Sequence, residues 1–135
     1  MTTQAQIMQF LAEQFPQQKC KVDSVGDGCA TIRHEIGHAE LRPGGTVAGP
    51  VMMMVADVAL YVAIFGQIGI VPLAVTTGLN INFLRKPSAD KAIIGVAKLM
   101  KVGKSLAVGE VTLFSEGLAD PVAHAVGTYS IPKAT

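Results

Sequence analysis

The chain has 135 residues, of which 50% are hydrophobic and only 16% are charged, and its formal net charge is +1. This length suits one domain with a sizeable core, so we expect residues 1–135 to form a single domain. The near-neutral charge and the lack of a basic run exclude the usual features of nucleic-acid binding, and the low charge content indicates a surface partly buried against other copies of the chain.

Residues 3–15 are expected to form a short amphipathic helix, because apolar residues recur there at helical spacing up to Phe15 and Pro16 follows. The segment lacks the basic region and apolar run of a secretory signal. The two cysteines, Cys20 and Cys29, are too few for a disulfide framework or a zinc-ligand set. We therefore expect a cytoplasmic protein in which both thiols are small buried groups.

Residues 20–36 are expected to form a β-hairpin around the Gly-Asp-Gly turn at 26–28. In its second half Ala30, Ile32 and His34 alternate with polar residues, which is typical of a strand with one buried face. The Gly- and Pro-rich residues 42–50 predict a loop.

Residues 34–38, His-Glu-Ile-Gly-His, match the H-E-x-x-H motif of zinc hydrolases. In that motif a helix puts His34 and His38 on one face as metal ligands, and Glu35 acts as general base. On the strand expected here the two histidines would stand about 13 Å apart, too far to share a zinc ion. We therefore expect no metal site, and a zinc hydrolase is the least favoured alternative.

Residues 51–65 carry a single charged residue, Asp57, and predict a helix over about 50–66 that is buried on nearly all sides. Pro50 suits its first turn and Gly66 its end. The apolar stretch is shorter than the roughly 20 residues of a membrane span, so we expect a core helix and no membrane partner.

Four β-rich segments follow, over residues 75–83, 91–102, 105–116 and 121–131. In the first, strict alternation would put Thr77 on the face of Leu79 and would put Thr76 on the opposite face. The order of helix, two strands, long apolar helix and four strands predicts an α+β fold, in which an antiparallel sheet wraps around one buried central helix.

Asp57 is the residue most in need of an explanation, because a carboxylate in an apolar helix is costly unless it is hydrogen-bonded or faces a cleft. It lies eight residues after Gly49, where the helix would begin with free N–H groups and a positive dipole end. A carbonyl oxygen held there would be polarised, and a carboxylate could activate water for attack. The alternative is a structural role, in which Asp57 bonds a neighbouring strand or a partner subunit.

The segments RPGGTVAGPVMMMVADVALYVAIFG, TTGLNINFLRKP and KVGKSLAVGEVTLFSE resemble hotdog-fold acyl-coenzyme A thioesterases of the phenylacetate-degradation (PaaI-like) type. The resemblance covers nearly the whole chain and is most specific over residues 42–87. It implies a hotdog fold and hydrolysis of an acyl-coenzyme A thioester without a metal or other cofactor. It also implies side-by-side dimers, or dimers of dimers, with sites at the subunit interface.

The same resemblance assigns roles to single residues. The Gly49 N–H would hold the thioester oxygen, Asp57 would act as general base or nucleophile, and Thr76 or Thr77 would position water. The family loop typically reads N-x-x-G-x-x-H-G-G, and this chain has Arg42 at the Asn position, Ala48 at the His position and Pro50 at the second Gly. Arg42 could still donate to a carbonyl or to a carboxylate of the substrate.

These departures leave open a second hypothesis, a hotdog protein that binds acyl-coenzyme A without catalysis. A hotdog hydratase or dehydratase is less favoured, because such enzymes generally use a His with an acid and no His lies between His38 and His124. For the phosphates of coenzyme A the sequence offers cations at a strand end and around the turn at Gly103. These candidates are Arg85, Lys86, Lys101 and Lys104.

Overall fold

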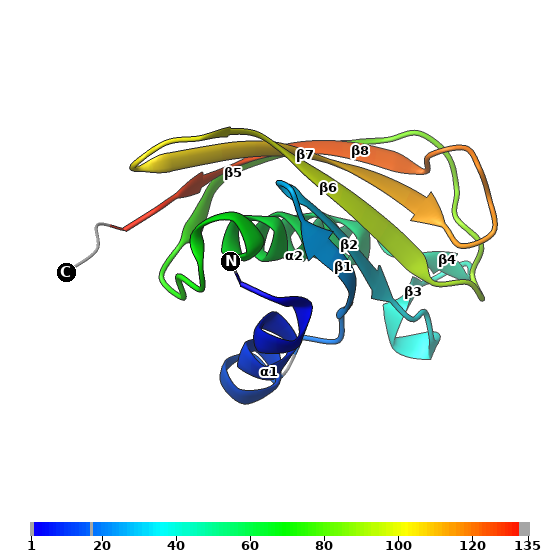
Figure 1. Ribbon diagram of the computed structural model, residues 1–135. Coiled ribbons are helices and arrows are strands. Elements are labelled where there is room, and N and C mark those ends of the chain that lie inside the picture. Colours follow the sequence, from blue (N-terminus) through cyan, green and yellow to red (C-terminus); the bar gives the residue numbers. More distant parts are fainter. Residues whose placement is uncertain (1, 17, 133–135) are drawn as a thin grey trace.

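The computed structural model describes residues 2–16 and 18–132 and has a six-stranded antiparallel sheet in the order β1-β2-β6-β7-β8-β5. Figure 1 shows the long helix α2 running beneath the curved sheet, with α1 further below. The expected α+β fold, a sheet wrapped around one central helix, is confirmed. The main elements are α1 Gln4–Gln14, β1 Lys21–Gly26, β2 Cys29–His34, α2 Gly49–Ile68, β5 Val75–Phe83, β6 Ile93–Val102, β7 Leu106–Ser115 and β8 Ala123–Ser130.

The first two predicted units form as expected. Helix α1 starts at Thr3, whose side chain accepts from the Gln6 N–H while the Gln6 side chain accepts from the Thr3 N–H, a reciprocal capping box. The β1–β2 hairpin turns at Asp27 and Gly28, whose φ angles are 53° and 72°. Two successive left-handed residues match the twist of the flanking strands, which explains the Asp-Gly pair.

Residues 42–50 were expected to be a loop, but short regular pieces lie within this range and just before it. A 3-10 turn at His38–Glu40 leads into a two-stranded ribbon of β3 (Leu41–Arg42) and β4 (Thr46–Val47). Each strand has only two residues, so no periodic pattern could reveal them. The ribbon fixes the direction in which the chain enters α2.

Helix α2 begins one residue before and ends two residues after the predicted range of 50–66. Gly66 does not end it, contrary to the prediction; Gly69, with a φ of 97°, does. Gly66 is buried, and a Cβ there would collide with the side chain of Val25 on β1. The glycine therefore allows close approach of helix and strand.

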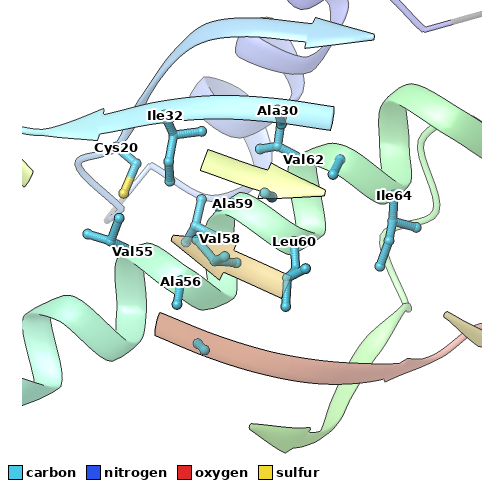
Figure 2. Packing of buried hydrophobic residues seen from close by; sticks show 14 of the residues in the cluster. Cys20, Ala30, Ile32, Val55, Ala56, Val58, Ala59, Leu60, Val62 and Ile64 are labelled. Carbon is cyan, nitrogen blue, oxygen red and sulfur yellow. The ribbon is translucent and has the colours of Figure 1, made fainter. Parts of the chain in front are cut away.

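By length and composition α2 could cross a membrane, since an 18-residue window of it has a mean hydropathy of 1.9. However, 61% of that window is buried inside the fold, as in a core helix. Figure 2 shows its side chains, including Val55 and Val62, gathered against Ala30 and Ile32 of β2.

Leu60 of α2, only 1% exposed, lies against two inward-facing strand glycines. A Cβ at Gly109 would stand 2.7 Å from Leu60 Cδ2 and 3.1 Å from the Lys98 carbonyl oxygen, and a Cβ at Gly127 would stand 2.6 Å from Leu60 Cδ1. We expect Gly109→Ala to lower the free energy of unfolding by about 1–3 kcal/mol, because neither the buried leucine nor the backbone can yield. Urea denaturation measures this loss. Gly78→Ala, where a Cβ meets nothing within 4 Å, is the control, and equal losses in both variants would contradict the packing argument.

Candidate active site

Asp57 lies a little over two turns into α2, and two hydroxyl groups donate to one oxygen of its carboxylate. Thr76 Oγ1 is 2.6 Å and the Tyr129 hydroxyl oxygen 2.7 Å from Asp57 Oδ1. The Tyr129 hydroxyl is also 2.9 Å from the Asp57 backbone carbonyl oxygen. Thr76 on β5 and Tyr129 on β8 are cross-strand partners, so the sheet brings both donors to the same point. The carboxylate in the apolar helix is therefore hydrogen-bonded, which offsets the free-energy cost of removing it from water.

A β-bulge decides which threonine reaches Asp57. The register of β5 against β8 shifts between Thr76 and Gly78, so that Thr76 faces Tyr129 and Thr77 is the extra residue. The strict alternation predicted for this strand is therefore wrong at Thr76, which points inward. Thr77 Oγ1 instead donates to the Thr128 carbonyl oxygen at 3.3 Å. Of the two candidates, the structure brings Thr76 to Asp57.

The carboxylate borders a hollow of about 210 Å³ between α1, α2 and the ends of β5 and β8. Its lining combines this single acid with two phenols and otherwise largely apolar side chains, which suits an apolar group held beside a polar centre. The lining residues are Phe15, Asp57, Val58, Tyr61, Ala74, Thr76 and Tyr129.

Tyr129 was not singled out from the sequence, although it has the parity of the buried Ala123 and Ala125 in its strand. That parity predicts an inward position but not the partner. Burial raises the pKa of the Tyr129 hydroxyl well above its usual range, and the nearby charge of Asp57 raises it further. The phenol therefore stays protonated and donates at neutral pH.

Gly49 lines a second hollow, of about 410 Å³, at the start of α2. Its N–H donates to no other residue in the described parts of the chain, as expected at a helix N-terminus. Three cationic side chains, Arg42, Arg85 and Lys86, line the same hollow. The hollow thus combines a free backbone donor, a helix dipole and positive charge, a combination that attracts anionic or carbonyl oxygens.

Within one chain Gly49 and Asp57 are not close. Eight residues of helix separate them, which at 1.5 Å per residue is about 12 Å along the axis, and they line different hollows. A thioester held by the Gly49 N–H could not be reached by Asp57 of the same chain, because reacting atoms must approach to roughly 3–3.5 Å.

The four candidate cations do not form one cluster. Arg85 donates to the Pro121 carbonyl oxygen at 2.8 Å, near the sheet end where β6 begins. Lys101 is near the other end of β6, eight residues or about 26 Å further along the strand, where it lines a separate hollow with Asp27. Lys104 is exposed in the turn that follows.

The His-Glu-Ile-Gly-His segment does not form a helix. His34 ends β2 and His38 begins the 3-10 turn, so the two imidazoles do not share a helical face. His34, 1% exposed, lies between Cys20 Sγ (3.6 Å from Nδ1) and Glu40 Oε2 (3.3 Å from Nε2). Glu35 pairs with Arg33 at 2.9 Å.

The thiol of Cys20 has a polar neighbour that was not expected from the sequence, the imidazole of His34. Burial nevertheless raises the pKa of the Cys20 thiol to about 12. The thiol thus stays protonated and acts as a small buried donor, in line with its expected role. No group of three or more His, Cys, Asp or Glu side chains within residues 2–16 and 18–132 is arranged to hold a metal ion.

Glu40 anchors the segment that leads to Gly49. Its carboxylate accepts from the Gly37 N–H at 2.7 Å and also meets His34 and Lys19, and these contacts, the Gly37 bond first, hold its pKa below the usual range. A carboxyl whose pKa is depressed on folding stabilises the fold at higher pH and loses this contribution as pH falls through the folded value.

We therefore expect Glu40→Gln to flatten the pH dependence of the melting temperature below about pH 5, because glutamine cannot be protonated there. The wild type should lose more of its thermal stability between pH 6 and 3 than this variant does. Glu13→Gln, on the exposed side of α1, is the control. Parallel curves for wild type and Glu40→Gln would contradict the assignment.

His124 has an acidic partner that is not its neighbour along the chain. Its Nε2 is 3.0 Å from Glu110 Oε1 on the neighbouring strand β7, and both side chains are 39% exposed. The two residues are 14 positions apart, so only strand pairing brings them together. The pair lies outside both hollows described above.

Comparison with known proteins places this geometry in a family. A family model described as "Thioesterase superfamily" matches residues 44–121. A crystal structure provisionally named a thioesterase, from Silicibacter sp. TM1040, is 41% identical, with a TM-score of 0.90 over 98% of this chain and 93% of its own.

Two more distant structures share the fold. A mutant of the phenylacetic acid degradation protein PaaI from Thermus thermophilus is 22% identical, with a TM-score of 0.74 over 92% of this chain and 99% of its own. A protein from Streptococcus mutans UA159, solved with acetyl-CoA bound, is 20% identical, with a TM-score of 0.76 over 87% of this chain and 91% of its own. No curated protein matches the sequence. The family match and the fold agree: the chain belongs to the thioesterase superfamily and has its hotdog fold.

Proposed function

We propose that the protein hydrolyses an acyl-coenzyme A thioester at a site built from two copies of the chain, with Asp57 as the reactive carboxylate. The observation that carries this is Asp57 itself, a hydrogen-bonded carboxylate at the edge of a largely apolar hollow. Membership of the thioesterase superfamily and the acetyl-CoA bound to the Streptococcus mutans relative support the substrate class.

The proposed chemistry needs only the residues of the two chains. Asp57 takes a proton from a water molecule, and the resulting hydroxide adds to the thioester carbonyl carbon. The Gly49 N–H stabilises the oxyanion that forms. The carbon–sulfur bond then breaks, and the thiolate of coenzyme A takes up the proton, leaving a free acid. If Asp57 attacks directly as nucleophile, an anhydride forms first and water then hydrolyses it to the same products.

Strand β5 supplies the geometry for a shared site. Within the part of the chain that the structure describes it is an edge of the sheet and pairs with β8 alone, and seven of its nine residues are exposed, which makes it a template for pairing with another strand. Thr76, near one end of β5, contacts Asp57. Phe83, at the other end, lies over Gly49, where a Cβ would be 3.4 Å from its ring.

Antiparallel pairing of β5 with β5 of a second copy would therefore place the Asp57 hollow of one subunit beside the Gly49 hollow of its partner. Each dimer would contain two such shared sites, related by two-fold symmetry. In each site Arg42, Arg85 and Lys86 of the chain that supplies Gly49 would meet the anionic coenzyme A moiety. Lys101 and Lys104 would belong to the other chain of each site, because they lie at the end of the sheet where β5 begins and Thr76 contacts Asp57.

A thiol-release assay over a panel of acyl-coenzyme A substrates, from acetyl to aromatic and long-chain acyl groups, tests the proposal. We expect turnover of at least one substrate by a dimer or larger oligomer, whose mass light scattering reports. Tight binding without turnover of any substrate would instead favour the non-catalytic acyl-coenzyme A binding protein, for which the replacements at Ala48 and Pro50 remain the argument.

A further inference from the structure

The two oxygens of the Asp57 carboxylate are in different situations. Oδ1 accepts from both Thr76 and Tyr129, at 2.6 and 2.7 Å. Oδ2 accepts no hydrogen bond from any residue within the described ranges 2–16 and 18–132. Among those residues no side-chain nitrogen or oxygen is buried without a partner, so Oδ2 is accessible at the border of the hollow.

The Tyr129 hydroxyl is held in place by its surroundings. The residue is 3% exposed, and its ring stacks on Tyr61 with centroids 6.1 Å apart and planes at 27°. Its backbone lies within β8, between neighbours on both sides of the sheet. Because the ring is fixed, the phenolic oxygen has a defined position, and this position is within hydrogen-bond distance of Asp57.

The hydroxyl also has a second acceptor, the Asp57 backbone carbonyl oxygen at 2.9 Å. A hydroxyl has one proton and donates to one oxygen at a time or is shared between two. When Asp57 is ionised, Oδ1 is the stronger acceptor, because hydrogen bonds to charged groups are the stronger ones. When Asp57 has taken up a proton, the carbonyl still accepts, so the buried hydroxyl is never left unpaired.

From these contacts we infer that Tyr129 is a positioning residue, which holds Asp57 by Oδ1 and thereby presents Oδ2 as the oxygen that reacts. The inference deepens the proposed function and rests on it for the chemical step. Thr76 on the neighbouring strand β5 also donates to Oδ1, but Tyr129 supplies the donor that is more deeply buried. Loss of the phenol would leave the carboxylate with the Thr76 hydroxyl as its remaining donor and would give it more freedom to rotate.

The test is Tyr129→Phe, which removes one oxygen and keeps the ring. We expect kcat to fall about 10- to 100-fold, the range for a hydrogen bond to a charged group, with KM within about twofold, because the acyl-coenzyme A contacts remain. Thr128→Val removes a hydroxyl from the adjacent residue, which lies on the other face of β8, and should keep wild-type kcat. A purely structural role would lower the melting temperature of Tyr129→Phe and leave kcat unchanged.

A second readout needs no turnover. In a crystal structure of Tyr129→Phe the Asp57 carboxylate should have a different or divided orientation, because of its two donors Thr76 alone remains. Tyr61→Phe removes a hydroxyl that donates to the Pro72 carbonyl oxygen at 3.0 Å, and should leave the orientation of the Asp57 carboxylate unchanged.

The outcomes separate the two proposals. If the wild type hydrolyses nothing in the panel, the proposed function fails, and the orientation of the carboxylate in Tyr129→Phe alone decides the placement of Asp57 by Tyr129. If Asp57→Asn abolishes turnover while Tyr129→Phe keeps both the wild-type kcat and the wild-type orientation of Asp57, the function stands and the inference about Tyr129 is overturned.

Discussion

Asp57→Asn is expected to lower kcat for acyl-coenzyme A hydrolysis about 10²- to 10⁴-fold, the usual contribution of a positioned general base. Asparagine has nearly the same shape, and its amide oxygen can accept from Thr76 and Tyr129 as Oδ1 does. The fold should therefore persist while the group that activates water is lost. Steady-state thiol release, with circular dichroism and melting temperature measured alongside, separates these two effects.

Asp23→Asn is a matched control for this substitution. Asp23 is exposed on β1 and pairs with Arg33 at 3.4 Å, outside both hollows. It undergoes the same chemical change and should keep wild-type kcat. A folded Asp57→Asn protein with kcat within tenfold of wild type would rule out Asp57 as the base. Loss of the folded state would favour the structural role weighed from the sequence.

Mixed dimers of two inactive variants are expected to regain about half the activity of a wild-type dimer, because one of the two shared sites would contain both Gly49 and Asp57 intact. One subunit carries Asp57→Asn and the other Gly49→Pro, which removes the backbone N–H and should by itself cost about 10²- to 10³-fold in kcat. Co-expression with two affinity tags and tandem purification isolates the mixed species for assay.

The backbone at the start of α2 can accept a proline in place of Gly49. Proline is favoured at the first helical position, and it requires an extended residue before it. Ala48 already has φ −66° and ψ 138°. Gly49→Ala is the control, since it adds a Cβ near Phe83 but keeps the N–H. Mixed dimers as inactive as either parent would contradict a site shared between subunits.

The sequence by itself determined most of the elements. Apolar spacing in residues 3–15, the Gly-Asp-Gly turn and alternation in the later strands each depend on neighbours along the chain, and the structure confirms these elements. Asp57 was also identifiable, because a single charge in a long apolar helix is costly wherever the helix packs. The helix end was wrongly predicted at Gly66, because the sequence does not show that this glycine is needed for the packing of Val25.

Only the tertiary structure decided how the candidate site is assembled. The bulge that turns Thr76 toward Asp57 depends on the register of β5 against β8, which is set by residues about 50 positions away. In the sequence Tyr129 is one of several alternating residues of a strand. Its hydroxyl becomes a candidate functional group only because the folded sheet places it beside Asp57 of α2. Local periodicity follows from backbone geometry, which the sequence reports directly. Contacts between distant segments depend on register and packing, which no local pattern encodes.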